Sequence, residues 1–139
     1  MDEDADFTYL TEHDVRFAET DAQGVVFFGE YLTYLDEAVL NYWKAIGHPY
    51  EGVLEDGWEV FVVHAELDYH TSATYGDTLR GAVRVAAVGT SSITFEYRCE
   101  RADGTLLATG ELVQVAVDEL GESAPIPEFI REAIAAFQH

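Results

Sequence analysis

The 139-residue sequence has one cysteine, three prolines and no long apolar run. The single cysteine, Cys99, excludes an internal disulfide and is typical of a protein kept in a reducing compartment. No apolar stretch approaches the roughly 18–20 residues that cross a bilayer, so the sequence predicts no membrane-spanning helix. The acidic residues 1–6 are unlike the positively charged start of a signal peptide. We therefore expect a cytoplasmic protein with a disordered acidic N-terminus at residues 1–6.

Positive charge is also scarce, because Lys44 is the only lysine and 7 basic residues face 27 acidic ones, a formal net charge of −20. A surface of this sign repels nucleic acids and anionic membranes, so neither is expected as a partner. The acidic residues are spread through the whole chain, and concentrated counterions would screen their mutual repulsion. This pattern predicts a protein of a salt-loving organism, and the alternative is an ordinary acidic protein.

The hydrophobic content indicates a folded protein. Hydrophobic residues make up 48% of the chain and aromatic residues 13%, which is more than a disordered chain contains. The length suits one domain with one core, and no repeat or interdomain linker interrupts it. We therefore treat residues 1–139 as a single domain.

A long helix is predicted from Phe28 to Ile46, where polar residues recur at steps of three or four positions. These residues are Glu30, Thr33, Glu37, Asn41 and Lys44. They form one narrow stripe, and the rest of the surface is mostly apolar, so the helix must be covered on most sides. Gly47 is the expected C-cap, and Pro49 stops any continuation.

Asp36 lies off this polar stripe, about 100° round the helix from the centre of the stripe. We therefore expect Asp36 to occupy a partly buried place. It is either a structural carboxylate whose hydrogen bonds are satisfied or a residue that orients a subunit contact or a water in a pocket.

Strand-like stretches precede and follow the predicted helix in the sequence. Residues 8–17 are strand-like, and four further stretches with alternating apolar residues follow the helix, at 58–69, 78–88, 91–100 and about 105–118. Asp103-Gly104 predicts a hairpin turn, and a change of phase near Gly110 predicts a bulge in the last strand. Residues 128–137 predict a short C-terminal helix. Because consecutive hairpins require antiparallel pairing, the prediction is an α+β fold: a curved antiparallel sheet of about five strands wrapped round one long central helix.

One short motif precedes the long helix. Residues 19–31, ETDAQGVVFFGEY, contain an acid, a threonine, an aspartate, a glycine turn, an apolar run and a tyrosine. Together with residues 67–79 and 88–111, this motif resembles the 4-hydroxybenzoyl-CoA thioesterase-like family of acyl-CoA thioesterases, which have the hotdog fold. The resemblance covers nearly the whole chain. It implies hydrolysis of an acyl-CoA thioester, without a metal or any other cofactor.

The resemblance implies that Asp21 is the catalytic carboxylate, acting as nucleophile or as general base. It also implies that the backbone N–H near Phe28 polarises the thioester carbonyl. A physical argument agrees, because a helix start offers unpaired N–H groups and a partial positive charge. Gly24 would permit the tight turn that brings Asp21 to this helix start. The alternative is that Asp21 is only a turn or capping residue.

Further residues are predicted to bind the substrate. They are Gly24, Val26, Phe27, Tyr31, Phe61, Thr90, Ser91 and Ser92. The aromatic residues among them, and Phe28, are expected to belong to the core, and some of them would also line an acyl pocket. Hotdog domains pair into a continuous sheet with shared active sites, so a homodimer is expected, and a homotetramer formed by two dimers. Thr90, Ser91 and Ser92 would then lie near the helix start of the partner.

The sequence departs from the family at several positions. Phe28 and Glu30 stand where family members often have histidine and asparagine, and residues 69–72, YHTS, replace a run that contains a basic residue. The remaining candidates for CoA phosphate contacts are Arg80, Arg84, Arg98 and Arg101. Alternatives to an acyl-CoA thioesterase are a thioesterase for acyl carrier protein and a non-catalytic protein that binds acyl thioesters. The histidines have no metal-ligand spacing with one another or with Cys99, so no metal site is predicted.

Overall fold

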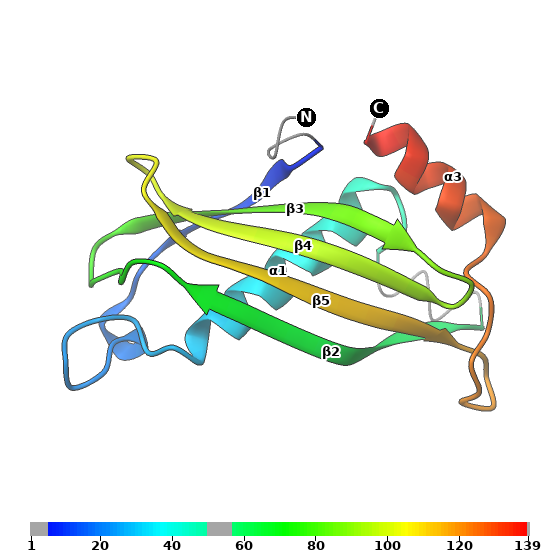
Figure 1. The fold of residues 1–139 in the computed structure, drawn as a ribbon, viewed down its shortest axis with the longest axis horizontal. Coiled ribbons are helices and arrows are strands. Elements are labelled where there is room, and N and C mark those ends of the chain that lie inside the picture. Colours follow the sequence, from blue (N-terminus) through cyan, green and yellow to red (C-terminus); the bar gives the residue numbers. More distant parts are fainter. Residues whose placement is uncertain (1–5, 50–56, 139) are drawn as a thin grey trace.

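The computed structural model describes residues 6–49 and 57–138 (Figure 1). Of the predicted disordered stretch at 1–6, residues 1–5 lie outside the described residues. The elements in chain order are β1 (Thr8–Asp14), a short 3-10 helix η1 (Phe17–Glu19), α1 (Glu30–Ala45), β2 (Glu59–Tyr69), β3 (Thr78–Val88), β4 (Ser92–Arg101), β5 (Leu106–Val117) and α3 (Glu128–Phe137). No helix in the described part of the chain is long and apolar enough to cross a membrane.

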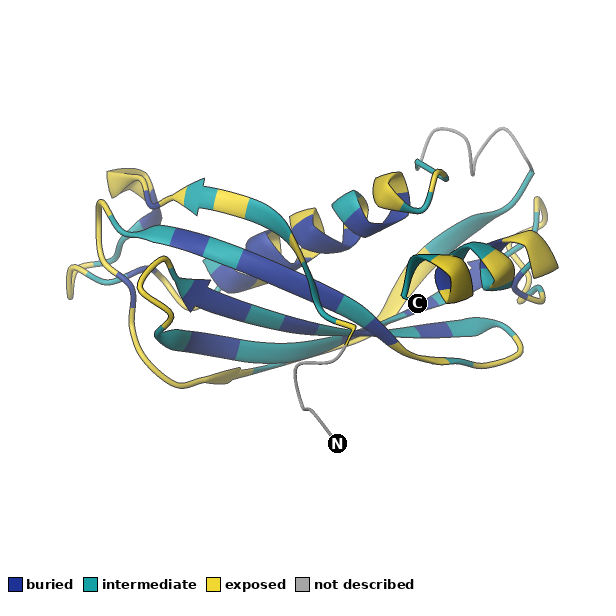
Figure 2. Cartoon of the chain, turned by 90° about the horizontal axis from the view of Figure 1, so that it is seen from above, coloured by how far each residue is buried: buried dark blue, intermediate teal, exposed yellow. Residues whose placement is uncertain are grey.

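The five strands form one antiparallel sheet in the order β1-β3-β4-β5-β2, which curves round α1 (Figure 1). Alternation along the strands gives the sheet a dry inner face: Ile93, Phe95 and Tyr97 of β4 are buried. The side of α1 that faces the sheet is buried as well (Figure 2), with Leu35 and Val39 fully inaccessible. The predicted α+β fold, with a curved sheet wrapped round a long helix, is confirmed.

The two ends of α1 follow from local sequence. At the C-terminal end, Gly47 has a φ of +88°, and the amides of Gly47 and His48 donate to the carbonyls of Lys44 and Trp43 at 3.0 Å each. This Schellman pattern confirms the predicted glycine cap. At the other end, the helix begins at Glu30 instead of Phe28, because residues 27–30 first form a turn closed by the Glu30 amide on the Phe27 carbonyl.

The bulge predicted near Gly110 in the last strand lies at Leu107, where the register between β4 and β5 shifts, and not at Gly110 itself. The register runs unbroken through this residue, which lies opposite Leu67 on β2 and Tyr97 on β4. A Cβ atom at Gly110 would lie 2.6 Å from Leu67 Cδ2 and 3.3 Å from Leu35 Cδ1. The absent side chain therefore lets α1 and β2 approach each other closely.

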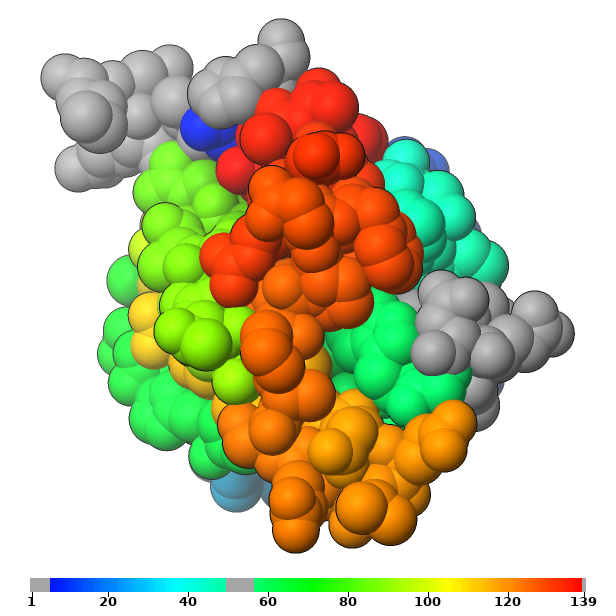
Figure 3. Space-filling view, turned by 90° about the vertical axis from the view of Figure 1, so that its right-hand side faces the viewer, coloured from blue at the N-terminus to red at the C-terminus, as the bar shows by residue number. Residues whose placement is uncertain are grey.

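Helix α3 covers one end of the core, between the C-terminal end of α1 and strand β3 (Figure 3). Ile130 and Ile134 are the buried residues of this helix. The side-chain oxygen of Gln138 accepts hydrogen bonds from the Tyr42 hydroxyl at 2.8 Å and the Val85 amide at 2.6 Å. Its side-chain nitrogen donates to the Val85 carbonyl at 3.1 Å, so one amide joins α3 to both α1 and β3.

Candidate active site

Asp21 begins a tight turn that precedes α1. The Gly24 amide donates to the Asp21 carbonyl at 2.9 Å, and the Gln23 amide donates to Asp21 Oδ1 at 2.9 Å. Gly24 has a φ of +81°, a backbone conformation that favours glycine, which supports its predicted role in the turn. The second carboxylate oxygen, Oδ2, accepts no hydrogen bond within the described part of the chain. Asp21 therefore stabilises its own turn with one oxygen and keeps the other available.

Backbone pairing holds this loop against the connection between β2 and β3. Thr20 bridges to Val26, and Val25 bridges to Thr74. The Val26 amide donates to the Ala73 carbonyl at 2.8 Å. These bonds place the Asp21 turn beside the end of β2 and lead the chain directly into α1.

The start of α1 supplies free backbone donors. The amides of Phe28 and Gly29 make no hydrogen bond to any of residues 6–49 or 57–138. The Tyr69 hydroxyl donates to the Phe28 carbonyl at 2.9 Å and so ties the helix start to the end of β2. Unpaired N–H groups at the positive end of a helix dipole can stabilise an oxygen that gains negative charge.

A hollow of about 340 Å³ brings these groups together. It is lined by Asp21, Gln23, Val25, Val26, Phe28, Tyr31, Tyr69, His70, Thr71 and Ser72. Of the predicted site residues, Asp21, Val26, Phe28 and Tyr31 meet here. The segment 69–72 was not among the predicted site residues, although it belongs to a stretch, 67–79, that matches the family.

The aromatic residues expected in the core divide into two groups. Tyr31 is buried with 3% of its surface exposed, whereas Phe27, Phe28 and Phe61 are 45%, 63% and 51% exposed. The core prediction is therefore wrong for these three phenylalanines. Phe27 lies beside Phe28 at a ring-centroid distance of 4.5 Å, next to the hollow but not in its lining. Phe27, Phe28 and Phe61 are exposed because no other segment of the described chain packs over them.

The other predicted substrate-binding residues lie elsewhere in the same chain. Phe61 is near the beginning of β2, whereas the end of this strand reaches the hollow. Thr90 and Ser91 belong to the turn between β3 and β4, and Ser92 is the first residue of β4, at the opposite end of the sheet from the Asp21 turn (Figure 1). One chain does not bring these residues to its own Asp21. Their role at the partner's site stays a prediction.

Glu19 is a buried carboxylate two residues before Asp21, with 5% of its surface exposed. It accepts hydrogen bonds from the Arg16 amide at 2.9 Å and pairs with His13 Nε2 at 2.8 Å. Burial alone would raise the pKa of Glu19, but these hydrogen bonds outweigh it and hold the pKa below its usual value. The Glu19 carbonyl also accepts the Phe27 amide at 2.9 Å, so Glu19 anchors both ends of the loop that carries Asp21.

Replacing Glu19 with glutamine is expected to lower the free energy of unfolding at pH 7 by roughly 1–3 kcal/mol. Because the folded-state pKa is depressed, the stabilisation is complete above the unfolded-state value near 4.5 and is lost as the pH falls through the folded-state value. The difference between wild type and variant should therefore shrink below about pH 4.5 in thermal unfolding followed across pH. Glu12→Gln, an exposed change on β1, is the matched control and should show no such difference.

The arginines predicted to contact CoA phosphates have different surroundings. Arg84 and Arg98 form ion pairs with glutamates of β4, and Arg80 lies over the Tyr9 ring. Arg101 also forms ion pairs, with Asp77 at 3.4 Å and Asp103 at 3.7 Å, but it differs in donating to the carbonyl of Ser72 at 3.0 Å, and Ser72 lines the hollow. Of the four, Arg101 is therefore best placed to reach a phosphate near the hollow.

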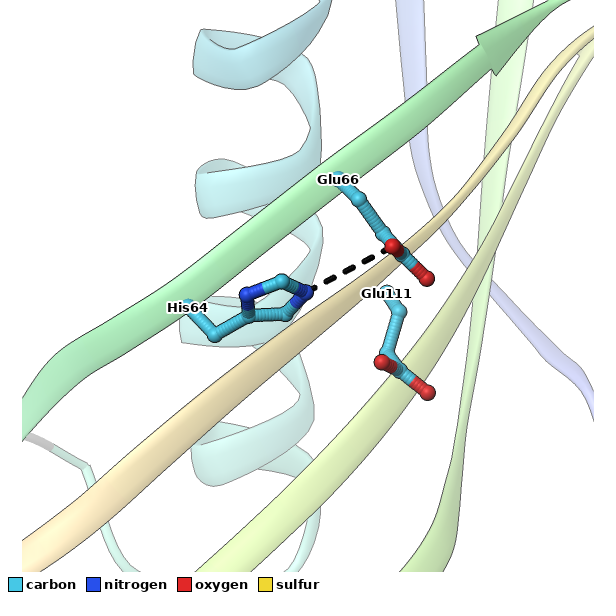
Figure 4. A group of neighbouring side chains, drawn as sticks. All are labelled: His64, Glu66 and Glu111. Carbon is cyan, nitrogen blue, oxygen red and sulfur yellow. Dashed lines mark ion pairs between the residues drawn. The ribbon is translucent and has the colours of Figure 1, made fainter.

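A separate group of possible metal ligands lies on the sheet, formed by His64 and Glu66 of β2 and Glu111 of β5 (Figure 4). Their ligand atoms lie within 4.8 Å of one another, and His64 Nε2 is 3.5 Å from Glu66 Oε2. Imidazole and carboxylate donors suit a divalent cation. None of the three lines the Asp21 hollow. The sequence did not indicate this group, because its two glutamates become neighbours of each other only through the pairing of β2 with β5.

Comparisons with known proteins agree with this geometry. Residues 15–134 match the family described as the thioesterase-like superfamily. An acyl-CoA thioesterase, YbgC of Haemophilus influenzae, is 33% identical over 126 residues, which cover 90% of each chain. A 1,4-dihydroxy-2-naphthoyl-CoA hydrolase of Synechococcus elongatus is 28% identical over 127 residues, covering 89% of this chain and 93% of the relative. A thioesterase of Thermus thermophilus, solved in complex with coenzyme A and Zn, is 31% identical, has a TM-score of 0.83, and 95% of each chain is covered.

Proposed function

Because this chain belongs to the thioesterase-like superfamily, we propose that it hydrolyses an acyl-CoA thioester to a carboxylic acid and free coenzyme A. The chain is an enzyme of thioester hydrolysis, as its named relatives are. One observation carries the proposed mechanism: Asp21, which has a free carboxylate oxygen, and Phe28, which has an unpaired amide, line the same hollow. The bound coenzyme A of the Thermus thermophilus thioesterase supports CoA as the carrier.

In the proposed reaction, the thioester carbonyl oxygen accepts a hydrogen bond from the Phe28 amide. This donor stabilises the negative charge that develops on the oxygen, an effect of roughly 3 kcal/mol for one such donor in other enzymes. Asp21 then acts in one of two ways. As general base it takes a proton from water, whose oxygen bonds to the carbonyl carbon; as nucleophile it bonds to that carbon itself. In both routes the C–S bond breaks, the thiolate leaves and takes up a proton, and one water is consumed.

A thiol-release assay tests the proposal and separates its rivals. Purified protein is given acyl-CoAs of several chain lengths and the same acyl groups on an acyl carrier protein, and free thiol is measured. We expect hydrolysis of acyl-CoA, since docking of a −20 chain to an acidic carrier is electrostatically poor at low salt. Faster hydrolysis of the carrier-bound substrate would favour that alternative. Binding of acyl-CoA without thiol release would favour the non-catalytic alternative.

The exposed edge of the sheet supports a homodimer. Strand β2 is an edge strand of 11 residues, and Phe61, Val62 and Val63 on it are each at least 50% exposed. A long edge with apolar side chains is a template for pairing with another strand. We assign this edge to a second copy of the chain, which extends the sheet across the dimer. Two such dimers would form the predicted homotetramer.

The acidic surface supports adaptation to high salt. Raising KCl from 0.1 M to 3 M is expected to increase the free energy of unfolding by about 1 kcal/mol or more, because the Debye length falls from about 10 Å to below about 3 Å. For a domain of this size the gain corresponds to a rise in Tm of roughly 3–5 °C. Sucrose of equal osmolality is the control for a general effect of solute exclusion. Equal Tm values in both KCl concentrations would contradict the halophilic assignment.

A further inference from the structure

Two further hollows follow the Asp21 hollow along the side of α1 that faces β2. The next one lies at Leu32 and shares Phe28 and Tyr69 with the first. The third has a volume of about 250 Å³ and lies between Leu40 and Phe61, on the β2 edge assigned above to the second copy, so in the proposed dimer the partner would border its open side. Positions 28, 32, 36 and 40 are four residues apart and therefore lie on one side of the helix. The three hollows therefore lie in a row along α1, starting from the proposed catalytic groups, although the second and third share no lining residue.

The third hollow contains two polar side chains in an otherwise apolar lining, Asp36 and Gln114. Gln114 is 7% exposed, and its side-chain oxygen accepts the indole N–H of Trp43 at 3.0 Å. Because an indole nitrogen can only donate, the oxygen of Gln114 must face it, which leaves the NH₂ group without a partner within the described residues. This NH₂ group is not one of the fully buried atoms without a partner among the described residues, so it is accessible from the hollow and can donate to a group that enters there.

Asp36 provides the complementary group. It was expected in a partly buried place, but in the single chain it is exposed at the wall of the hollow, between the apolar residues Leu32 and Leu40 of the same helix side. It makes no hydrogen bond or ion pair with the residues that the structure describes. An ionised carboxylate can only accept hydrogen bonds. A ligand group that meets both Asp36 and Gln114 must therefore donate one hydrogen bond and accept another, which a hydroxyl group does.

We propose that the third hollow binds the far end of the acyl chain and selects acyl groups that carry a hydroxyl there. The hydroxyl donates to Asp36 and accepts from the Gln114 NH₂ group. This inference rests on the proposed function, because it assumes that the thioester lies at Phe28. Asp36 lies eight positions after Phe28, two in the turn before α1 and six in the helix itself, a rise of about 12 Å. An extended chain advances roughly 1.2 Å per bond, so the hydroxyl oxygen stands about ten bonds from the carbonyl carbon.

The test compares kcat/KM for 10-hydroxydecanoyl-CoA and decanoyl-CoA. Wild type is expected to prefer the hydroxylated substrate about tenfold or more, the effect of a hydrogen bond to a charged group. Asp36→Leu should abolish this preference by slowing the hydroxylated substrate without slowing decanoyl-CoA. Gln114→Met should weaken the preference in the same direction. Glu37→Leu, an exposed change on the neighbouring polar stripe, is the matched control and should keep it.

Butyryl-CoA separates this inference from the proposed function, because its acyl chain is too short to reach Asp36. Hydrolysis of butyryl-CoA and decanoyl-CoA without preference for the hydroxylated substrate would overturn the inference alone. If no acyl-CoA is hydrolysed, the proposed function fails. The inference is then tested by binding alone, and equal affinity for 10-hydroxydecanoyl-CoA and decanoyl-CoA would overturn it as well. A change of oligomeric mass in Asp36→Leu with an unchanged substrate preference would make Asp36 a subunit contact and would also overturn it.

Discussion

Replacing Asp21 with asparagine is expected to lower kcat/KM for acyl-CoA hydrolysis roughly 100- to 10,000-fold, the range found when a positioned acid or base is removed. The substitution is informative because asparagine keeps an oxygen that can accept the Gln23 amide and so preserves the turn. The chemistry is lost, since an amide is neither a base nor an effective nucleophile. The measurements are thiol release, acyl-CoA binding and thermal unfolding, and only the first should change strongly.

Asp118→Asn is the matched control for this experiment. Asp118 accepts the Leu120 amide at 2.9 Å in a turn of the same kind, beyond the end of β5 and away from the hollow. Its replacement should leave both activity and stability close to wild type. An Asp21→Asn enzyme as active as the Asp118→Asn enzyme would establish Asp21 as a turn residue and remove it from the mechanism.

A single turnover in H₂¹⁸O distinguishes the two roles of Asp21 when enzyme is in excess over substrate. As general base, Asp21 delivers labelled water to the carbonyl carbon, so the first carboxylic acid product contains ¹⁸O. As nucleophile, Asp21 forms an anhydride with the acyl group; when water opens it at the Asp21 carbonyl carbon, the product acid is unlabelled and the label enters the Asp21 carboxylate, an outcome that the general-base route cannot give. Mass spectrometry of the product acid and of the peptide that contains Asp21 reads both outcomes.

Replacing Val63 with lysine is expected to produce an inactive monomer. Val63 is 61% exposed on the edge strand β2, and in a two-fold dimer paired along this edge each new charge would approach its copy. Facing like charges cost several kcal/mol, which corresponds to a rise in dimer Kd of roughly 100-fold or more. Activity should fall with the dimer, since Thr90, Ser91 and Ser92 can contribute only to the hollow of another chain. Light scattering and thiol release over a range of protein concentrations check both effects.

Leu120→Lys tests whether any new lysine on an exposed apolar position has the same effect. Leu120 is 84% exposed and lies after β5, in a turn that borders the start of β2 and not the middle of that strand where Val63 lies. This variant should keep the mass and activity of wild type. A Val63→Lys protein that remains a fully active dimer would place the subunit contact on another surface.

The sequence predicted the parts of this protein that local periodicity and local motifs determine. The phase of β4, the glycine cap of α1 and the pairing of Asp21 with the helix start all lie within short segments, whereas the register shift between Val62 and His64 in β2 was not predicted. It failed where contacts join distant segments. Gly110 was interpreted within its own strand, whereas its role depends on Leu35 and Leu67.

The exposed phenylalanines show a second kind of failure. Apolar periodicity identifies the residues that avoid water, but it does not tell whether the same chain, a second copy or a substrate covers them. Phe28 and Phe61 were therefore assigned to the core, although in the single chain they lie outside it and are exposed. Gln114 was missed for a related reason, because its unpaired amide becomes visible only once Trp43 is known to occupy its oxygen.

Glu19 and Asp21, the two acids at the start of the 19–31 motif, would give the same loss of activity in a mutational scan that measures only activity in cells. Glu19 is buried under its hydrogen bonds, whereas Asp21 lies at the surface of the hollow. A substitution at Glu19 removes active molecules by loosening the loop, so cooler growth or a second stabilising mutation can restore function. In the proposed mechanism, Asp21→Asn keeps the turn and leaves the molecules folded but slow, so no stabilising suppressor is expected for it. The presence or absence of stabilising suppressors, more than the loss of activity, would distinguish the structural role of Glu19 from the proposed catalytic role of Asp21.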